Sequence, residues 1–228
     1  MNKAVGFLFA CVIFPAGCAT RQPSFTLVDR TVGQTPINTP IEAPAESTSV
    51  EQVEEQVVQV REPDVIFVPT PQDVVDKMLE LAQVTREDVV YDLGCGDGRI
   101  VVTAARRYGC KAFGYDIDPE RVAESRENVE KNELSHLARI EQKDIFTLDL
   151  SEASVVTLYL LPRLNVKLIP QLEKLKSGSR IVSHDFRMRG VKPDQRVKLT
   201  SDEDQAEHKI FLWTAPLRKK VEEDSADL

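Results

Sequence analysis

The sequence predicts an α/β fold: a mostly parallel seven-stranded sheet with an antiparallel edge strand and helices on both faces. Three observations support this prediction. Short apolar runs alternate with amphipathic helical segments from about residue 66 onward, which is typical of parallel sheets. A loop with three glycines joins the first apolar run to the next helix, as ligand-binding loops do in such folds. The composition, with 42% hydrophobic and 29% charged residues, is that of an ordinary globular domain.

The first helix is expected to follow Thr70, a good N-cap residue, with Pro71 at its first position. Its inner face carries apolar residues at helical spacing: Val74, Val75, Met78, Leu79 and Ala82. Further helices are expected at 99–108, 119–131 and 164–175. Apolar runs predict the strands, which are expected at 89–93, 112–116, 138–142, 155–160, 180–186, 196–199 and 209–214.

The last two predicted strands, 196–199 and 209–214, have no helix of usual length between them. We therefore expect them to pair antiparallel at one edge of the sheet, whereas the strands joined by helices are expected to be parallel. The folded domain is expected to span residues 63–216, and a charged tail follows at 217–228.

The chain before this domain divides into two parts. Residues 1–17 resemble an export signal, because Lys3 precedes an apolar run and small residues precede Cys18. This pattern is typical of a bacterial lipoprotein, in which Cys18 becomes the acylated N-terminus; the alternative is an uncleaved hydrophobic anchor. Residues 18–62 are rich in Pro, Thr, Ser, Gln and Glu without apolar periodicity, and they are expected to form a disordered tether.

The charge and the cysteine pattern exclude several classes of site. The net charge of -8 and the pI near 5.1 predict an acidic surface that repels phosphate backbones, so nucleic acid is not expected as a partner. The 4 cysteines show neither zinc-ligand spacing nor a disulfide framework, and Cys95 and Cys110 are expected as small buried thiols. His136 and His208 are expected on the surface, and no metal site is expected.

The glycine-rich loop spans residues 92–98, with the sequence D-L-G-C-G-D-G. Gly94, Gly96 and Gly98 let the backbone turn sharply and approach a ligand closely. Dinucleotide-binding loops read G-x-G-x-x-G, with the third glycine one residue later than here. Asp92 precedes the first glycine by two residues and suits a ligand with an ammonium group, whereas it would repel a pyrophosphate. We expect Asp92, Asp97 and the three glycines to bind the ligand.

Acidic residues also end the next two strands. Asp116 closes the second strand, where a carboxylate can accept both hydroxyls of a ribose. Asp118 is a weaker candidate for that role, because Asp118-Pro119 also reads as the start of a helix. Asp144 ends the third strand, where it can accept a hydrogen bond from an adenine amino group; the alternative is a turn cap. Three acids around one glycine loop predict a nucleoside with a cationic end.

The fourth and fifth strands end in polar and aromatic residues that are candidates for catalysis. In an open parallel sheet, ligands bind beyond the carboxyl ends of the strands. Tyr159 is expected there, either orienting a nucleophile or as a core aromatic with its hydroxyl at the rim. His184 and Asp185 end the fifth strand near the same mouth, and His184 has both a structural and a functional interpretation.

Four segments together resemble a known family: 67–71 (FVPTP), 91–100 (YDLGCGDGRI), 155–161 (VVTLYLL) and 180–186 (RIVSHDF). They are similar to the archaeal broad-specificity protein-lysine methyltransferases and their mitochondrial relatives, over roughly residues 66–215. The resemblance implies the Rossmann-like class I methyltransferase fold, S-adenosylmethionine as cofactor, and a lysine of a protein substrate as methyl acceptor. It also implies cofactor contacts at Asp92, Gly94, Gly96, Asp116 and Asp144.

The resemblance leaves three hypotheses for function: methylation of protein lysine amines, methylation of a small molecule or another protein group, and a non-catalytic S-adenosylmethionine-binding module. The signal at residues 1–17 motivates the third hypothesis. Because S-adenosylmethionine is made in the cytoplasm, a lipoprotein anchored on the exported side lies outside that pool. A retained anchor that leaves the domain facing the cytoplasm is the alternative location.

Overall fold

The structure is a computed structural model that describes residues 67–219. The predicted signal, Cys18, the predicted tether and the end of the predicted tail lie outside these residues. The helices are α1 (Gln72–Leu81), α2 (Arg99–Tyr108), α3 (Pro119–Lys131), the 3-10 helix η1 (Ile145–Thr147) and α4 (Pro162–Leu172). The strands are β1 (Val89–Leu93), β2 (Lys111–Asp116), β3 (Ala138–Gln142), β4 (Val155–Leu158), β5 (Arg180–His184), β6 (Gln195–Thr200) and β7 (Glu207–Thr214).

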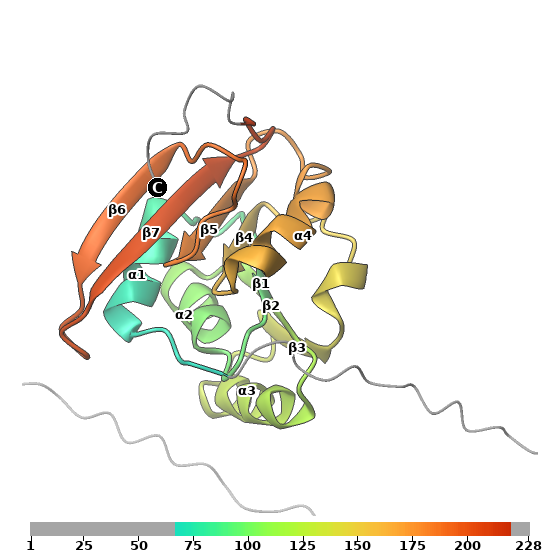
Figure 1. The fold of residues 1–228 in the computed structure, drawn as a ribbon. Helices are drawn as coiled ribbons and strands as arrows, with labels where there is room; N and C mark the ends of the chain where they lie inside the picture. The colour runs from blue at the N-terminus through green and yellow to red at the C-terminus, as the bar shows by residue number, and fades with distance from the viewer. Residues whose placement is uncertain (1–66, 220–228) are drawn as a thin grey trace, which may run out of the picture. The chain divides into compact units, whose positions relative to one another are not determined.

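The 7 strands form one sheet in the order β3-β2-β1-β4-β5-β7-β6 (Figure 1). Strands β1 to β5 are parallel, and β7 runs antiparallel to both β5 and β6. The predicted fold class and the antiparallel pairing of the last two strands are confirmed. The chain leaves β1 toward β2 and β3 and then returns to the other side of β1 through β4. Ligands bind at such a reversal point, beyond the carboxyl ends of the strands.

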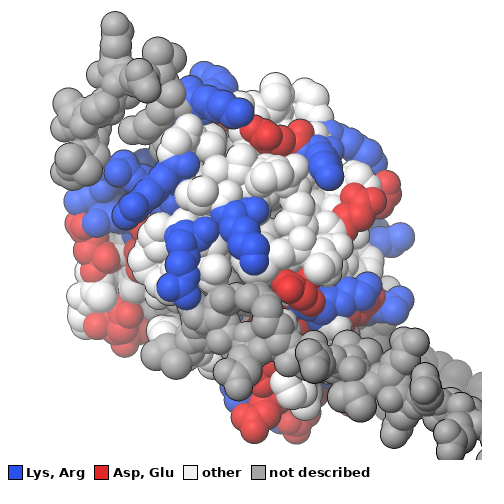
Figure 2. All heavy atoms as spheres, turned by 45° about the vertical axis from the view of Figure 1, so that its right-hand side comes forward, with Lys and Arg blue, Asp and Glu red and all other residues white. Residues whose placement is uncertain are grey.

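The surface charge is uneven. Figure 2 shows a face on which Lys and Arg side chains predominate, although the whole chain carries a net charge of -8. A shallow groove in the described surface is lined by Arg163, Arg189 and the exposed side chain of Val166. Within residues 67–219, no helix is both long and apolar enough to cross a membrane.

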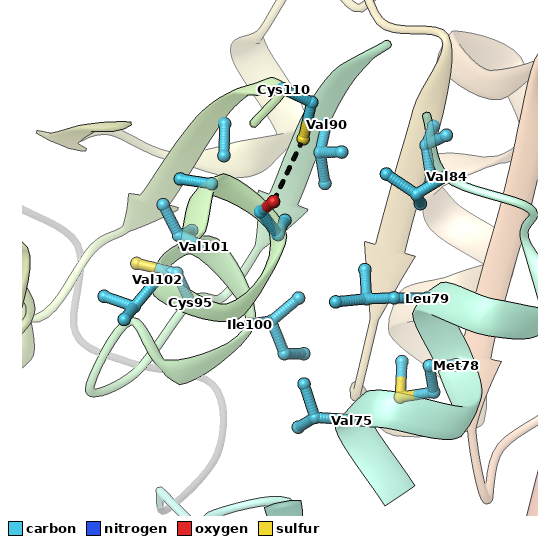
Figure 3. Packing of buried hydrophobic residues seen from close by; sticks show 14 of the residues in the cluster. Val75, Met78, Leu79, Val84, Val90, Cys95, Ile100, Val101, Val102 and Cys110 are labelled. Carbon is cyan, nitrogen blue, oxygen red and sulfur yellow. Dashed lines mark hydrogen bonds between the residues drawn. The ribbon is translucent and has the colours of Figure 1, made fainter. Parts of the chain in front are cut away.

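Two hydrophobic clusters hold the helices on the two faces of the sheet. One cluster contains the buried residues of α1, α2 and α3, and the other contains those of α4 and η1. In Figure 3, Val75 and Leu79 of α1 lie against Ile100 of α2. The whole predicted inner face of α1 is confirmed, since all five of its residues are fully buried. Each of the four larger side chains, those of valine, methionine and leucine, stabilises the fold by about 1.5–3 kcal/mol relative to an exposed one.

Strand and helix ends near the pocket differ from the predictions. The fourth strand ends at Leu158 rather than at residue 160, because Leu161 takes the N-cap position and Pro162 opens α4. The fifth strand ends at His184 rather than at residue 186. There Asp185 adopts a φ of 53°, which breaks the extended backbone. Because both strands end early, Tyr159 and Asp185 lie in loops at the edge of the sheet rather than in strands.

The cysteine prediction is confirmed, and one histidine prediction is wrong. Cys95 and Cys110 are buried free thiols, and the thiol of Cys110 donates a hydrogen bond to the carbonyl of Ala104 over 3.4 Å (Figure 3). His136 is exposed as expected, but His208 is buried. The alternation along β7 places His208 on the same face as Ile210, under α1, even though both of its chain neighbours are charged.

Candidate active site

The main pocket lies at the carboxyl ends of β1, β2 and β4, on both sides of the reversal point. It is a cleft that opens to solvent, and residues from the strand ends and from the chain before α1 line it. Six of the predicted site residues line it: Asp92, Gly94, Asp97, Asp116, Asp144 and Tyr159. The structure therefore brings together residues that are far apart in the sequence, as the parallel sheet predicts.

Gly96 and Gly98 shape the loop rather than line the pocket. Gly96 has a φ of 54°, and a Cβ atom on it would lie 2.2 Å from the ring of Phe67. A Cβ atom on Gly98 would lie 2.8 Å from Cβ of Ser125 on α3. Both glycines therefore allow a close approach that no other residue permits. Gly94 is the glycine of the loop that faces the ligand space.

Asp92 is the buried acid of the site, a residue that is only 2% exposed. Its Oδ1 atom accepts a hydrogen bond of 2.6 Å from the hydroxyl of Thr157, whereas Oδ2 has no partner among the described residues. Burial raises the pKa of Asp92 to about 7, and the charges of Asp116 and Asp97 act in the same direction. An ammonium group placed at Oδ2 would satisfy this atom and stabilise the ionised carboxylate.

Asp116 is held by the backbone around it. Its Oδ2 atom accepts the N–H of Gly96 over 2.9 Å, and its Oδ1 atom accepts the N–H of Asp118 over 3.0 Å. Each carboxylate oxygen has room for a second hydrogen bond, so ribose hydroxyls remain suitable donors. Asp118 accepts the N–H of Glu120 over 2.8 Å as the N-cap of α3, which confirms the helix-start interpretation of Asp118-Pro119.

Asp144 combines the two interpretations that its sequence position left open. It caps η1 by accepting the N–H of Phe146 over 3.0 Å, and it also lines the pocket. The turn after β3 thus fixes the carboxylate at the far side of the pocket from Tyr159. This placement is compatible with a contact to an adenine amino group.

Residues 67–71, which we call the entry strip, precede α1 and pack against the glycine loop. Sequence reasoning did not predict this contact. Phe67 packs against Gly96, and the guanidinium of Arg121 lies 5.1 Å from the centroid of its ring. Arg99 donates to the carbonyl of Thr70 over 2.6 Å and also binds the carboxylate of Asp97 with its Nε and Nη2 atoms. Asp97 therefore positions the entry strip through Arg99.

Thr70 is not the N-cap of the first helix, so that prediction is wrong. The helix begins at Gln72 after Pro71, whose ψ of 145° is extended, and the N–H of Gln72 donates to Glu203 from a distant turn. The hydroxyl of Thr70 lies instead 3.1 Å from Nδ1 of His184. Thr70 also lines the pocket, and this makes it a site residue that the sequence did not reveal.

The three candidate catalytic residues occupy two layers. Tyr159 lines the pocket and is half-buried, and burial raises the pKa of its hydroxyl. The ring of His184 lies behind it at a centroid distance of 4.0 Å and is fully buried. Asp185 is also absent from the pocket lining, and its Oδ1 atom accepts the N–H of Lys209 over 2.8 Å. Catalytic roles for all three stay predictions.

His184 and Asp185 come together with His208 in a cluster that sequence reasoning missed. One ligand-type atom from each of the three residues lies within 4.8 Å of the others. The Nε2 atom of His184 and the Nδ1 atom of His208 are 2.8 Å apart, which is a hydrogen-bond distance. No local sequence signal joins these residues, because β5 and β7 bring them together.

Comparison with known proteins identifies the family. Residues 92–195 match the model of the ANTKMT methyltransferase domain. A protein-lysine N-methyltransferase of the archaeon Saccharolobus islandicus is 46% identical over 153 residues, which cover 66% of this chain and 94% of that protein. The chain belongs to this methyltransferase family. A Xenopus laevis lysine N-methyltransferase, named for its ATP synthase substrate, is 30% identical over 133 residues, and the match spans about half of that relative, 56% of its length.

A solved structure agrees with this assignment of the methyltransferase fold. A crystal structure described as an RNA methyltransferase from Salinibacter ruber, in complex with S-adenosyl-L-homocysteine, is 47% identical. It superposes with a TM-score of 0.61 and covers 69% of this chain and 98% of that chain. S-adenosylmethionine is therefore the cofactor, as the sequence predicts. The methyltransferase offers this ligand a fitting site, since the unpartnered Oδ2 atom of Asp92 suits its ammonium group.

Proposed function

We propose that the protein transfers methyl groups from S-adenosylmethionine to the side-chain amines of lysines in a protein substrate. The 46% identity to a protein-lysine N-methyltransferase, across 94% of that relative, carries this proposal. The pocket supports it, because Thr70 and Tyr159 both line it and both lie beside His184, so two residues with hydroxyl groups are close enough together to bind an amine.

We assign the cofactor contacts by the order of the acids along the pocket. Asp92 near the end of β1 would bind the ammonium group, Asp116 at the end of β2 the ribose hydroxyls, and Asp144 after β3 the adenine amino group. This orientation directs the sulfonium away from Asp144, toward Tyr159 and Thr70. When bound, S-adenosylmethionine supplies an electrophilic methyl group on its sulfonium.

The residues around the methyl-bearing end of the cofactor have two roles, which are to align the acceptor amine and to exclude water. Methyl transfer is an in-line displacement, so the protein contributes by aligning the amine and excluding water. Leu160 and Leu164 give the acceptor side apolar walls. A lysine must also lose a proton before its nitrogen can attack, since an ammonium has no lone pair.

An experiment with a labelled methyl group tests the acceptor class. The full-length protein is incubated with tritiated S-adenosylmethionine and a cell extract, and the products are digested with protease or ribonuclease. We expect label in protease-sensitive material and methyl-lysine in acid hydrolysates. An Asp92→Asn variant at equal concentration provides the background. Label confined to small molecules would overturn the lysine proposal.

RNA is a second candidate acceptor because of two observations. The 47% identical structure from Salinibacter ruber is described as an RNA methyltransferase. The basic face in Figure 2 would attract a phosphate backbone despite the acidic net charge. Ribonuclease-sensitive label in the same experiment would favour RNA over protein.

We also propose that residues 1–17 direct the protein to a membrane, with Cys18 as the acylated residue. The support is the sequence pattern alone, and these residues lie outside the described part of the chain. Protease added to intact cells should degrade the domain if it lies on the exported side, and should spare it if a retained anchor leaves it facing the cytoplasm. Mass spectrometry of the N-terminal peptide distinguishes an acylated Cys18 from an uncleaved Met1.

A further inference from the structure

A continuous chain of hydrogen bonds leads from the pocket wall to the surface. The hydroxyl of Thr70 lies 3.1 Å from Nδ1 of His184, and Nε2 of His184 lies 2.8 Å from Nδ1 of His208. Nε2 of His208 lies 3.1 Å from the carboxylate of Asp204 in the turn between β6 and β7. Thr70 lines the pocket, both histidines are buried, and Asp204 is exposed. Four separate segments of the fold thus build one path.

When both rings are neutral, the acid at the outer end sets the direction of the hydrogen bonds from Asp204 back to Thr70. The N–H of Ala206 and the ring of His208 lower the pKa of Asp204, so this carboxylate is ionised and only accepts. Nε2 of His208 therefore donates to it, and Nδ1 of the neutral His208 ring accepts the Nε2–H of His184, which also lies 3.4 Å from Oδ2 of Asp185. Nδ1 of His184 must then accept the hydroxyl proton of Thr70. The oxygen of Thr70 consequently presents only lone pairs to the pocket.

We propose that Thr70, His184 and His208 form a proton relay that takes the proton from the acceptor ammonium and holds it on His208. This inference rests on the proposed function, because a protonated lysine needs such a step. The ammonium gives a proton to Oγ1 of Thr70, and Thr70 gives its hydroxyl proton to Nδ1 of His184. In the same step, His184 gives its Nε2 proton to Nδ1 of His208. The lysine becomes a neutral amine and His208 becomes a cation, so protons and charge balance.

The surroundings of the two rings favour His208 as the place where the charge rests. Burial lowers the pKa of His184 to about 4, although Asp185 and Asp204 oppose this effect, so His184 passes the proton on without keeping it. His208 lies between two carboxylates, with Oδ2 of Asp185 at 3.3 Å from Nδ1 and Asp204 at 3.1 Å from Nε2. Tyr159 is the further titratable group that faces His184, through ring contact. After the product leaves, water in the pocket takes the proton back along the same atoms.

The relay gives a function to two buried polar side chains, those of His184 and His208. A metal ion is the competing interpretation, because His184, Asp185 and His208 offer three ligand atoms. Without an ion, the 2.8 Å contact between the ring nitrogens needs one proton between them, which is the Nε2–H of His184. Zinc analysis of the purified full-length protein distinguishes the two, and one zinc per chain would overturn the relay.

The principal test compares His208→Gln with His136→Gln in the full-length protein. Tritium transfer to extract protein is measured at saturating S-adenosylmethionine from pH 6.5 to 9.5. We expect His208→Gln to lose about 100-fold in rate at pH 7, the usual effect of a proton-transfer group. Its rate should then rise about tenfold per pH unit, because the variant depends on lysines that solvent has deprotonated, with an ordinary pKa near 10.4. His136 is exposed and remote, and its variant should follow the wild type.

A matched pair at the other end of the relay removes the ambiguity of a folding defect. Thr70→Val keeps the shape but removes the hydroxyl, whereas Thr70→Ser keeps the hydroxyl. Thr70→Val should reproduce the steep pH dependence, and Thr70→Ser should restore the wild-type profile. Calorimetry with S-adenosylhomocysteine should give similar affinities for all variants and shows that each is folded.

The outcomes separate the two proposals. If the wild type labels no protein lysine, the proposed function fails. If the wild type labels lysine but the variants lose rate equally at every pH, the relay is overturned and these side chains are structural. Asp204→Asn, a change at an exposed position, should give a smaller loss with the same dependence on pH; an unchanged rate would also count against the relay.

Discussion

The hydroxyl of Thr157 donates a hydrogen bond of 2.6 Å to one oxygen of Asp92, while the other oxygen lies buried with no partner among the described residues. One half of this carboxylate is thus fixed by the neighbouring strand, and the other half is directed at the ligand. A buried acid of this kind is destabilising until a cation binds.

Cofactor affinity should depend on pH through Asp92. Its pKa of about 7 means that the carboxyl is partly protonated at neutral pH, and a bound ammonium favours the ionised form. We expect the Kd for S-adenosylmethionine to rise below pH 7, by up to about tenfold per pH unit. Calorimetry between pH 5.5 and 8.5 measures this. Asp92→Asn should bind weakly with a flat profile, and a flat profile in the wild type would contradict the assignment.

Asp92 should also lower the stability of the empty protein at high pH. Its pKa lies above the value of about 3.9 that an unfolded chain shows, so the folded state loses stability as the pH rises from about 4 through 7. We expect Asp92→Asn to raise the free energy of unfolding at pH 8 by roughly 1–3 kcal/mol and to change it little at pH 4. Urea unfolding without cofactor at both pH values checks this. Destabilisation at pH 8 would show that the amide cannot replace the carboxyl.

Gly96→Ala should disrupt the cofactor loop through its clash with Phe67. The added Cβ atom would lie 2.2 Å from the ring, and the positive φ adds strain of about 1 kcal/mol. Gly178→Ala is a matched control, since Gly178 also has a positive φ but nothing lies within 4 Å of its Cβ position. We expect Gly96→Ala to lose cofactor affinity by at least about tenfold, and Gly178→Ala to lose only stability. Equal effects in both would assign the defect to strain alone.

A double variant isolates the clash. Phe67→Ala removes the ring that the new Cβ atom would meet, so adding it to Gly96→Ala should recover part of the lost affinity. The recovery stays incomplete because the strain at positive φ persists. Losses that simply add would contradict the contact between the two residues.

Asp116 and Asp118 are neighbours in the sequence with different expected roles. Asp116→Ala should weaken cofactor binding by about tenfold or more, because charged hydrogen bonds to ribose contribute about 1.5–3 kcal/mol. Asp118→Ala should cost about 1 kcal/mol of stability through the lost cap of α3 and leave affinity nearly unchanged. Calorimetry and thermal unfolding of both variants test the assignment. The reverse result would transfer the ribose contact to Asp118.

The cofactor side of the site could be predicted from the sequence because short sequence patterns define it. Each acid follows an apolar run, and parallel strands bring their carboxyl ends to one edge. The glycine loop carries its own signal in the positions of Gly94, Gly96 and Gly98. The sequence therefore placed Asp92 and Asp116 correctly at the pocket without any knowledge of the contacts between them.

The acceptor side depends on contacts between distant segments, which no local pattern encodes. The pair Thr70 and His184 forms only when α1 packs beside β5, and the helical pattern at Thr70 equally suggests a cap. His208 lies between two charged residues, and this hides the alternation that buries it. The sequence therefore indicated His184 as a candidate but did not reveal its partners Thr70 and His208.

Arg99 bridges the loop that holds Asp97 and the entry strip that ends in Thr70. A single guanidinium thus has one contact on the donor side and one on the acceptor side. Any shift of Asp97 when the cofactor enters is transmitted to the backbone carbonyl of Thr70, and the same linkage acts in reverse. Binding of either substrate should consequently change the affinity for the other by the same factor.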